Sequence, residues 1–227
     1  MNSALRLAAA IMVVALTACT TPPAAAPTTA KGTTAAGSAL PPDQLLAAVQ
    51  RAADQMDQTR DAAERTRLLT DATTSAQQCL AKAPDNGACQ YAQAQVLGLS
   101  ARERPLQAAA LLKEMLASLA KAESADPGLD HAGPARLTAV VLLRAPPWPL
   151  GPGDVDAAVV AAQRAVKRDP AYPPNLIALA QAQAKSDGAP QARATFAQAQ
   201  AVLQTWPVDA ERTQWQATVA QGLQQLQ

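Results

Sequence analysis

Apolar residues recur at intervals of three and four along most of the chain, and this periodicity constrains the fold more than any other feature. Such spacing places side chains on one face of an α-helix, whereas a β-strand requires alternation with a period of two. We find no convincing run of that alternation. Alanine, the strongest helix former, is the commonest residue, and aromatic residues make up 3% of the chain. The sequence therefore predicts an all-α protein of closely packed helices.

A second regularity has a period of 34 residues. Ala162 and Ala165 recur as Phe196 and Ala199. Small residues at such positions allow two antiparallel helices to approach closely, and we expect the larger Phe196 to fill the groove between hairpins. The Ala-x3-Phe pattern resembles the second helix of a tetratricopeptide repeat. The expected fold is a tetratricopeptide-like α-solenoid of antiparallel helical hairpins.

Prolines mark the breaks between the hairpins, because proline cannot continue a helix. Pro84, Pro127 and Pro170 lie 43 residues apart, which exceeds the repeat length and implies insertions inside the hairpins, at 100–105 and 145–153. The pattern predicts nine helices, over residues 42–57, 60–82, 87–99, 104–124, 132–144, 154–168, 173–186, 189–205 and 208–225.

The N-terminus is typical of a targeting segment. A short positive region and an apolar run, 7–16, that is too short to span a bilayer predict a signal peptide. Leu16-Thr17-Ala18-Cys19 resembles the lipobox of bacterial lipoproteins, and an ordinary secretory leader is the alternative. The resemblance implies a lipoprotein signal peptide over 1–18 and lipidation of Cys19. Thr20, rather than Asp, implies a lipid anchor in the outer membrane of a Gram-negative bacterium, with the body facing the periplasm.

The segment after Cys19 is rich in Pro, Ala and Thr and cannot bury enough apolar surface to fold. We expect residues 19–40 to form a flexible tether and residues 41–227 to form the helical domain. The 19 basic residues nearly balance the 18 acidic ones, and this balance argues against a nucleic-acid partner.

His131 is the only histidine, and the chain has no Gly-rich phosphate loop. One imidazole near Asp126 and Asp130 offers metal-ligand types, but a carboxylate at the start of a helix is commonly an N-cap. No Ser or Cys stands nearby for His131 to activate as a general base. We therefore expect Asp130 to cap a helix and His131 to lie at the surface. We expect no enzyme, no catalytic residue, no metal and no cofactor.

Cys79 and Cys89 stand five residues on either side of Pro84. Across an antiparallel turn they lie at similar height, and an oxidising compartment favours a disulfide between them. The alternative is two small buried residues at helix contacts.

The stretch between 144 and 154 holds four prolines in seven residues, which stiffen the connection. It presents Trp148 either as a fixed aromatic anchor for a partner or as a plug for its own hairpin. Arg136 and Arg144, eight residues apart on the preceding helix, either receive an acidic group of a partner or form local salt bridges. Trp206 and Trp215 are expected to pack in the core or to cap the solenoid.

Four segments form an ordered set: Gly133–Arg136, Ala145–Leu150, Gly153-Asp154 and Arg168–Asn175. Together they resemble the tetratricopeptide-like lipoproteins known as the T component of TRAP transporters, over roughly residues 60–205. Pro147 departs from that family's pattern, in which glycine precedes the tryptophan. The resemblance implies a lipid-anchored helical bundle that associates with the transporter's periplasmic solute-binding protein, self-assembles as a homo-oligomer and has no catalysis.

The expected function is thus a non-enzymatic adaptor that binds a protein partner. A general scaffold for envelope or outer-membrane assembly is one alternative. A carrier of a small apolar ligand is another.

Overall fold

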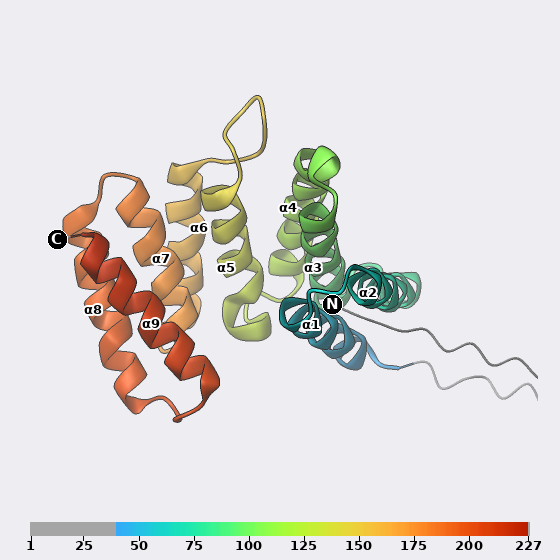
Figure 1. Cartoon of the computed structure of the whole chain (residues 1–227), viewed down its shortest axis with the longest axis horizontal. Coiled ribbons are helices and arrows are strands. Elements are labelled where there is room, and N and C mark those ends of the chain that lie inside the picture. Colours follow the sequence, from blue (N-terminus) through green and yellow to red (C-terminus); the bar gives the residue numbers. More distant parts are fainter. Residues whose placement is uncertain (1–39, 227) are drawn as a thin grey trace, which may run out of the picture. The chain divides into compact units, whose positions relative to one another are not determined.

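The computed structural model describes residues 40–226, which belong to a compact unit of residues 39–227 (Figure 1). The predicted signal peptide, Cys19 and the tether up to residue 39 lie outside the described residues. Between residues 40 and 226 no helix has the length and apolar character needed to cross a membrane. The helices are α1 (Pro42–Gln58), α2 (Ala62–Lys82), α3 (Gly87–Glu103), α4 (Ala108–Ala125), α5 (Leu129–Arg144), α6 (Val155–Arg168), α7 (Pro173–Lys185), α8 (Ala189–Thr205) and α9 (Ala210–Gln225).

These helices pair into hairpins that follow one another along the chain: α1 with α2, α3 with α4, α5 with α6 and α7 with α8 (Figure 1). The first helix of each hairpin also contacts the first helix of the next, and α9 continues this inner layer against α7. The predicted all-α solenoid of antiparallel hairpins is therefore confirmed. All nine predicted helices are present, with ends that differ from the predicted ones by at most four residues.

The predicted insertion at 145–153 is a connection inside a hairpin, whereas the one predicted at 100–105 is only partly so, because residues 100–103 extend α3. A 3-10 turn over Pro105–Gln107 joins α3 to α4. The connection from Ala145 to Asp154 joins α5 to α6 and extends beyond the helix ends (Figure 1).

Alanines make the close helix contacts that the repeat pattern predicts. Ala162, Ala165 and Ala199 are fully buried. Phe196 on α8 is 2% exposed and packs with apolar side chains of α7 and α9, so it fills the space between the last hairpin and the C-terminal helix. The small side chains allow backbones to approach, and the one large ring fills the gap that remains.

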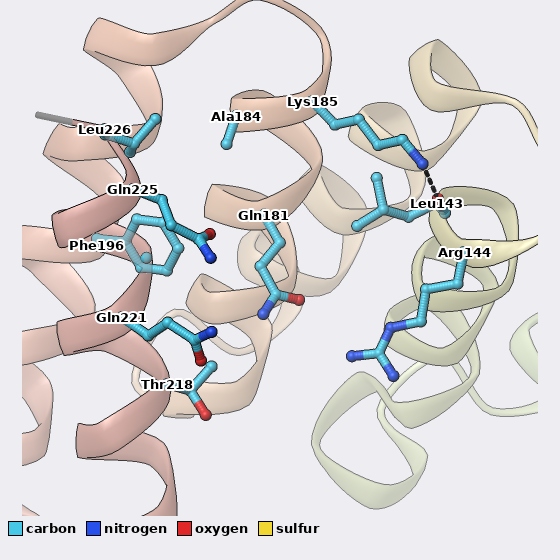
Figure 2. A pocket seen from close by; sticks show the side chains of 11 residues that line it. Leu143, Arg144, Gln181, Ala184, Lys185, Phe196, Thr218, Gln221, Gln225 and Leu226 are labelled. Atoms are coloured by element: carbon cyan, nitrogen blue, oxygen red, sulfur yellow. Dashed lines mark hydrogen bonds between the residues drawn. The ribbon is translucent and has the colours of Figure 1, made fainter.

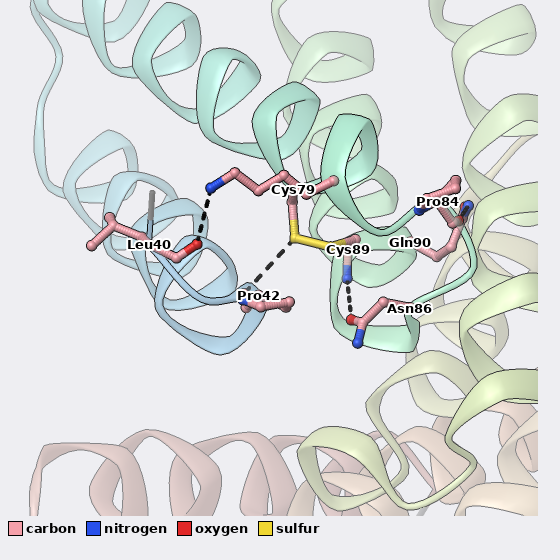
Figure 3. The surroundings of a disulfide bond; sticks show 8 residues. Leu40, Pro42, Cys79, Pro84, Asn86, Cys89 and Gln90 are labelled. Atoms are coloured by element: carbon pink, nitrogen blue, oxygen red, sulfur yellow. Dashed lines mark hydrogen bonds between the residues drawn. A yellow bond between two sulfur atoms is a disulfide. The ribbon is translucent and has the colours of Figure 1, made fainter. Parts of the chain in front are cut away.

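A disulfide joins Cys79 near the end of α2 to Cys89 near the start of α3, as the sequence predicts (Figure 3). Both cysteines are fully buried, and Leu45 of α1 packs against them. Asn86 starts α3, because its side-chain oxygen accepts a hydrogen bond from the Cys89 backbone N–H. The disulfide thus links the first hairpin to the second across the proline turn.

The start of α5 differs from the prediction. Asp130, His131 and Ala132 all adopt left-handed backbone angles, with φ between 50° and 62°, before the regular helix begins. Asp130 is not an N-cap: its carboxylate accepts hydrogen bonds from the Tyr91 hydroxyl and from Arg136 instead. The left-handed region is costly for residues with a Cβ, so these side-chain contacts must stabilise the turn.

Candidate binding groove

A groove with both polar and apolar side chains lies over α7, between α5 and α9. It consists of two neighbouring cavities, of about 510 Å³ and about 290 Å³. Both cavities are lined by Arg144, Gln181 and Thr218, one residue from each of the three helices. Because α5 and α9 wall a cavity whose floor is α7, the inner layer is concave here. We call this feature the inner groove.

Arg144 is the last residue of α5. Its guanidinium lines the larger cavity and points toward Gln181 (Figure 2). Arg144 is exposed, and no hydrogen bond or ion pair joins its side chain to another residue within 40–226. An arginine side chain has five N–H donors in a planar fork. The inner groove thus contains a cation that is unpaired among the described residues.

A second cation lies at the same end of the inner groove. Lys185, the last residue of α7, donates a hydrogen bond from Nζ to the Leu143 carbonyl oxygen at 2.8 Å. This contact satisfies one of the free carbonyls at the end of α5, where the helix dipole favours a positive charge. The ammonium keeps two further N–H donors for other partners.

Neutral hydrogen-bonding side chains line the opposite wall. Thr218, Gln221 and Gln225 on α9 border the larger cavity, facing Gln181 of α7 (Figure 2). Amide side chains both donate and accept hydrogen bonds, so this wall suits a polar occupant. Apolar side chains complete the lining of this cavity: Leu143, Ala184, Phe196 and Leu226.

Arg136, in contrast, serves the structure. Its side chain is 15% exposed and donates hydrogen bonds to the Asp130 carboxylate at 3.1 Å and to Asn175 Oδ1 at 3.2 Å. Its guanidinium also lies 4.9 Å from the centre of the Tyr172 ring. Arg136 borders the smaller cavity together with Arg144, as the eight-residue spacing predicts, but its charge is paired locally.

The Arg136 network joins three hairpins. Tyr91 of α3 is 3% exposed and donates a hydrogen bond to Asp130 Oδ2 at 2.8 Å. Burial raises the pKa of the Tyr91 hydroxyl well above its ordinary value, and the nearby Asp130 carboxylate raises it further. Asn175 of α7 is fully buried and donates to the backbone oxygens of His131 and Asp169.

His131 also takes part in this junction. Its Nδ1 lies 2.7 Å from Asp169 Oδ2, and its ring stacks on Tyr172 with the centroids 4.3 Å apart. Trp206 and Trp215 pack edge-on against Tyr172 and against each other, which agrees with the expected packing role. Within residues 40–226, no group of three or more His, Cys, Asp or Glu side chains is placed to hold a metal ion.

Trp148 stands outside the fold rather than plugging its hairpin. It is 86% exposed, and the neighbouring Leu150 is 73% exposed. Backbone hydrogen bonds hold the connection: Gly153 N–H donates to Pro146 O and Asp154 N–H to Leu142 O, both at 2.9 Å. The loop begins directly after Arg144, the residue of α5 that lines both cavities.

Sequence reasoning identified Arg144 but missed the opposite wall of the groove. Gln221 and Gln225 stand four residues apart, with Thr218 three residues earlier, which is the spacing of one helix face. The sequence alone therefore indicates that these three side chains share one face of a helix. What it could not show is that α9 lies across α7 from α5, because this depends on how the last helix packs.

No protein-family model and no curated protein matches the chain. Among solved structures, it is similar to a thermophilic TPR protein of Thermus thermophilus, where TPR denotes the tetratricopeptide repeat. The TM-score is 0.54 at 17% sequence identity, and the match covers 80% of this chain and 92% of the other. At this identity the likeness concerns the fold alone. The chain has a tetratricopeptide-like α-solenoid fold.

Proposed function

We propose that this chain is a non-enzymatic adaptor that binds another protein through the inner groove and the Trp148 loop. The observation that carries the proposal is the groove itself, where polar side chains from three helices converge with Arg144, which has no ion-pair partner within residues 40–226. A rigid concave helical surface loses little conformational entropy on binding, which favours such a role.

The exposed Trp148 supports the same function. Tryptophan is among the residues that dominate binding energy at protein interfaces, and a preordered loop reduces the entropy lost when it is buried. The connection around Trp148 carries no charge from Ala145 to Gly153. An exposed aromatic side chain on an uncharged, hydrogen-bonded loop suits an anchor that a protein partner buries.

For the partner, the proposal is a periplasmic solute-binding protein of a TRAP-type transporter. Its support is the sequence resemblance around Gly133–Arg136, Ala145–Leu150 and Arg168–Asn175. A scaffold for envelope assembly would use the same fold and is the competing function. A carrier of a small apolar ligand is another competing function, because apolar side chains such as Ile177 and Trp215 line the smaller cavity.

Lipid anchoring through Cys19 is part of the proposal. It rests on Leu16-Thr17-Ala18-Cys19, and multiple acyl chains hold a protein at a membrane far more firmly than one chain does. Replacing Cys19 by alanine is expected to move the protein from the membrane fraction to the soluble periplasmic fraction. Unchanged membrane association of the variant would contradict lipidation.

The partner is tested by photo-crosslinking in intact cells. A photoreactive residue replaces Gln221 in the inner groove, and a matched protein carries it at Gln163, an exposed glutamine on α6 that does not line the groove. We expect a solute-binding protein as the main product from position 221 and little from position 163. Outer-membrane assembly proteins, or only crosslinked copies of this chain, would contradict the transporter role.

A further inference from the structure

A separate cavity of about 500 Å³ lies in the N-terminal half of the chain, over α2. It shares no lining residue with the inner groove. The end of α3 contributes Glu103 and Arg104 to its lining. From α2 come Thr66, Thr70, Thr73 and Thr74, which are all the threonines of that helix. We call this feature the threonine cavity.

Threonine is a poor choice for these positions if only the helix matters. Its branched side chain loses rotamer freedom in a helix, so it is a weaker helix former than alanine, glutamine or glutamate. Thr66, Thr70 and Thr74 are exposed, so the core does not require them. A sequence that departs from local preference without a gain in packing usually does so at a functional site. The threonines therefore indicate a role other than stabilising α2.

The hydrogen bonds of the threonines determine what the cavity offers to a ligand. Each of the four hydroxyls donates its proton to a backbone oxygen of α2, at 2.7–3.0 Å. A hydroxyl has one donor and two lone pairs, so each threonine can still accept a hydrogen bond. Donors come from the Gln77 amide and from Arg104, which has no ion-pair partner within residues 40–226. The charge of Glu103 is paired with Arg65.

This lining disfavours three classes of ligand. An anion would meet the lone pairs of four hydroxyls and only one unpaired arginine. A cation would meet the positive charge of Arg104. An apolar group would leave polar side chains without hydrogen-bonding partners. The lining therefore favours a neutral ligand that has many donors and can also accept.

The spacing of the polar groups narrows the ligand further. The row from Thr66 to Gln77 presents five polar side chains over about 16 Å, or one in about 4 Å, at 1.5 Å per residue. An extended peptide directs an N–H to one side only at every second residue, about 7 Å apart. A sugar ring carries several hydroxyls within a shorter length, so it matches the row more closely.

We infer that the threonine cavity binds a neutral oligosaccharide. Hydroxyls of the sugar donate to the threonine oxygens, and its oxygens accept from Arg104 and Gln77. This site is additional to the proposed partner-binding function and does not depend on it, because the two surfaces have no residue in common.

The purified protein is tested on an array of immobilised neutral and acidic oligosaccharides, and its affinity for the best neutral glycan is measured by titration calorimetry. The double variant Thr70→Val, Thr74→Val removes two acceptors but keeps the branched shape and a similar helix propensity. It is expected to bind at least about tenfold more weakly. Arg104→Gln, which removes the guanidinium donors, is expected to weaken binding severalfold.

Thr213→Val is the matched control. Thr213 on α9 is exposed, donates its hydroxyl proton to the Asp209 backbone oxygen at 3.0 Å and does not line the threonine cavity. Its replacement is expected to leave the affinity for the glycan unchanged. Equal loss in this variant and in the double variant would show that the α2 hydroxyls are not the contact.

Three other outcomes would overturn the inference: no glycan is bound, only acidic glycans are bound, or the double variant keeps full affinity. Photo-crosslinking from position 221 separates the inference from the adaptor function. The double variant is expected to capture the protein partner as well as the wild type does. If a partner is captured and no glycan binds, the adaptor function stands and the glycan inference fails. If a neutral glycan binds through the threonines and no partner is captured, the inference stands and the adaptor function fails.

Discussion

The ring of Phe196 on α8 occupies the space that a side chain at Gly222 of α9 would need. A Cβ at position 222 would lie 2.3 Å from Phe196 Cζ, and Phe196 is almost fully buried. Glycine is thus required here by the close approach of α9 to the last hairpin. The same contact positions α9 as one wall of the inner groove, which Phe196 and Gly222 both line.

Gly222→Ala is expected to destabilise the protein. Overpacking costs about 1–3 kcal/mol, while the better helix propensity of alanine returns up to about 1 kcal/mol. We expect a net loss on the order of 1 kcal/mol, and at most about 2 kcal/mol, in the free energy of unfolding measured by denaturant titration.

Gly98→Ala is the matched control within α3. A Cβ at Gly98 would meet the flexible end of Met115 at 3.1 Å, and that end can move aside. The helix propensity then dominates, so this variant is expected to be as stable as the wild type or more stable. A destabilised Gly98→Ala beside an unaffected Gly222→Ala would contradict the packing argument.

The Cys79–Cys89 disulfide yields a second prediction. Closing a loop of about 11 residues stabilises the fold by about 2.8 kcal/mol in the chain-entropy model. The double variant Cys79→Ala, Cys89→Ala is therefore expected to melt about 5–10 °C below the oxidised wild type. With a strong reductant present, the difference in melting temperature between the variant and the wild type should become smaller. A difference of equal size under both conditions would assign the loss to packing around the two buried side chains.

The helices were predictable because their signals are local. Periodicity marked each helical segment, and Pro84, Pro127 and Pro170 marked the breaks between hairpins. The disulfide was predictable for the same reason, since Cys79 and Cys89 flank one short turn. The connection at 145–153 could be placed because its prolines interrupt the helical pattern, but nothing in the sequence indicated that residues 100–103 would lengthen α3.

The sequence could not show that Arg136 and Arg144 have different roles. Both stand on one face of α5, yet only Arg136 reaches a carboxylate, because three consecutive left-handed residues bring Asp130 beside it. A glycine is the usual sequence sign of left-handed backbone, and residues 130–132 contain none. The turn depends on contacts with Tyr91 of α3, which are distant along the chain.

The Tyr91 hydroxyl predicts how stability depends on pH. Its pKa is raised in the folded protein by burial, so the folded state holds this proton more tightly than the unfolded chain does. Stability from this group is complete below about pH 10, the ordinary pKa of tyrosine, and falls as the pH rises above it. The loss is expected to reach about 1.4 kcal/mol at about pH 11.

Tyr91→Phe isolates this effect. At about pH 7 the variant is expected to be about 1 kcal/mol less stable, because it lacks the hydrogen bond to Asp130. Between about pH 10 and pH 11 its stability should fall less steeply than that of the wild type, so the two curves converge. Parallel curves from denaturant titration across this range would show that Tyr91 does not titrate differently in the two states.

Trp148 yields the prediction that bears most directly on function. Its side chain is 86% exposed, so Trp148→Ala is expected to change the free energy of unfolding by no more than about 0.5 kcal/mol. Partner capture should nevertheless fall severalfold, because an exposed aromatic anchor contributes only when a partner buries it. The measurement is the yield of the photo-crosslinked product from position 221, beside a thermal melt of each variant.

Leu106→Ala provides the control, since Leu106 is a fully exposed apolar residue on the short 3-10 turn between α3 and α4. Its removal is expected to leave both stability and capture unchanged. Equal loss of capture in both variants would indicate a general dependence on apolar surface rather than a specific anchor. If Trp148→Ala instead lowered the melting temperature by many degrees, Trp148 would be part of the fold and its role as a partner anchor would be wrong.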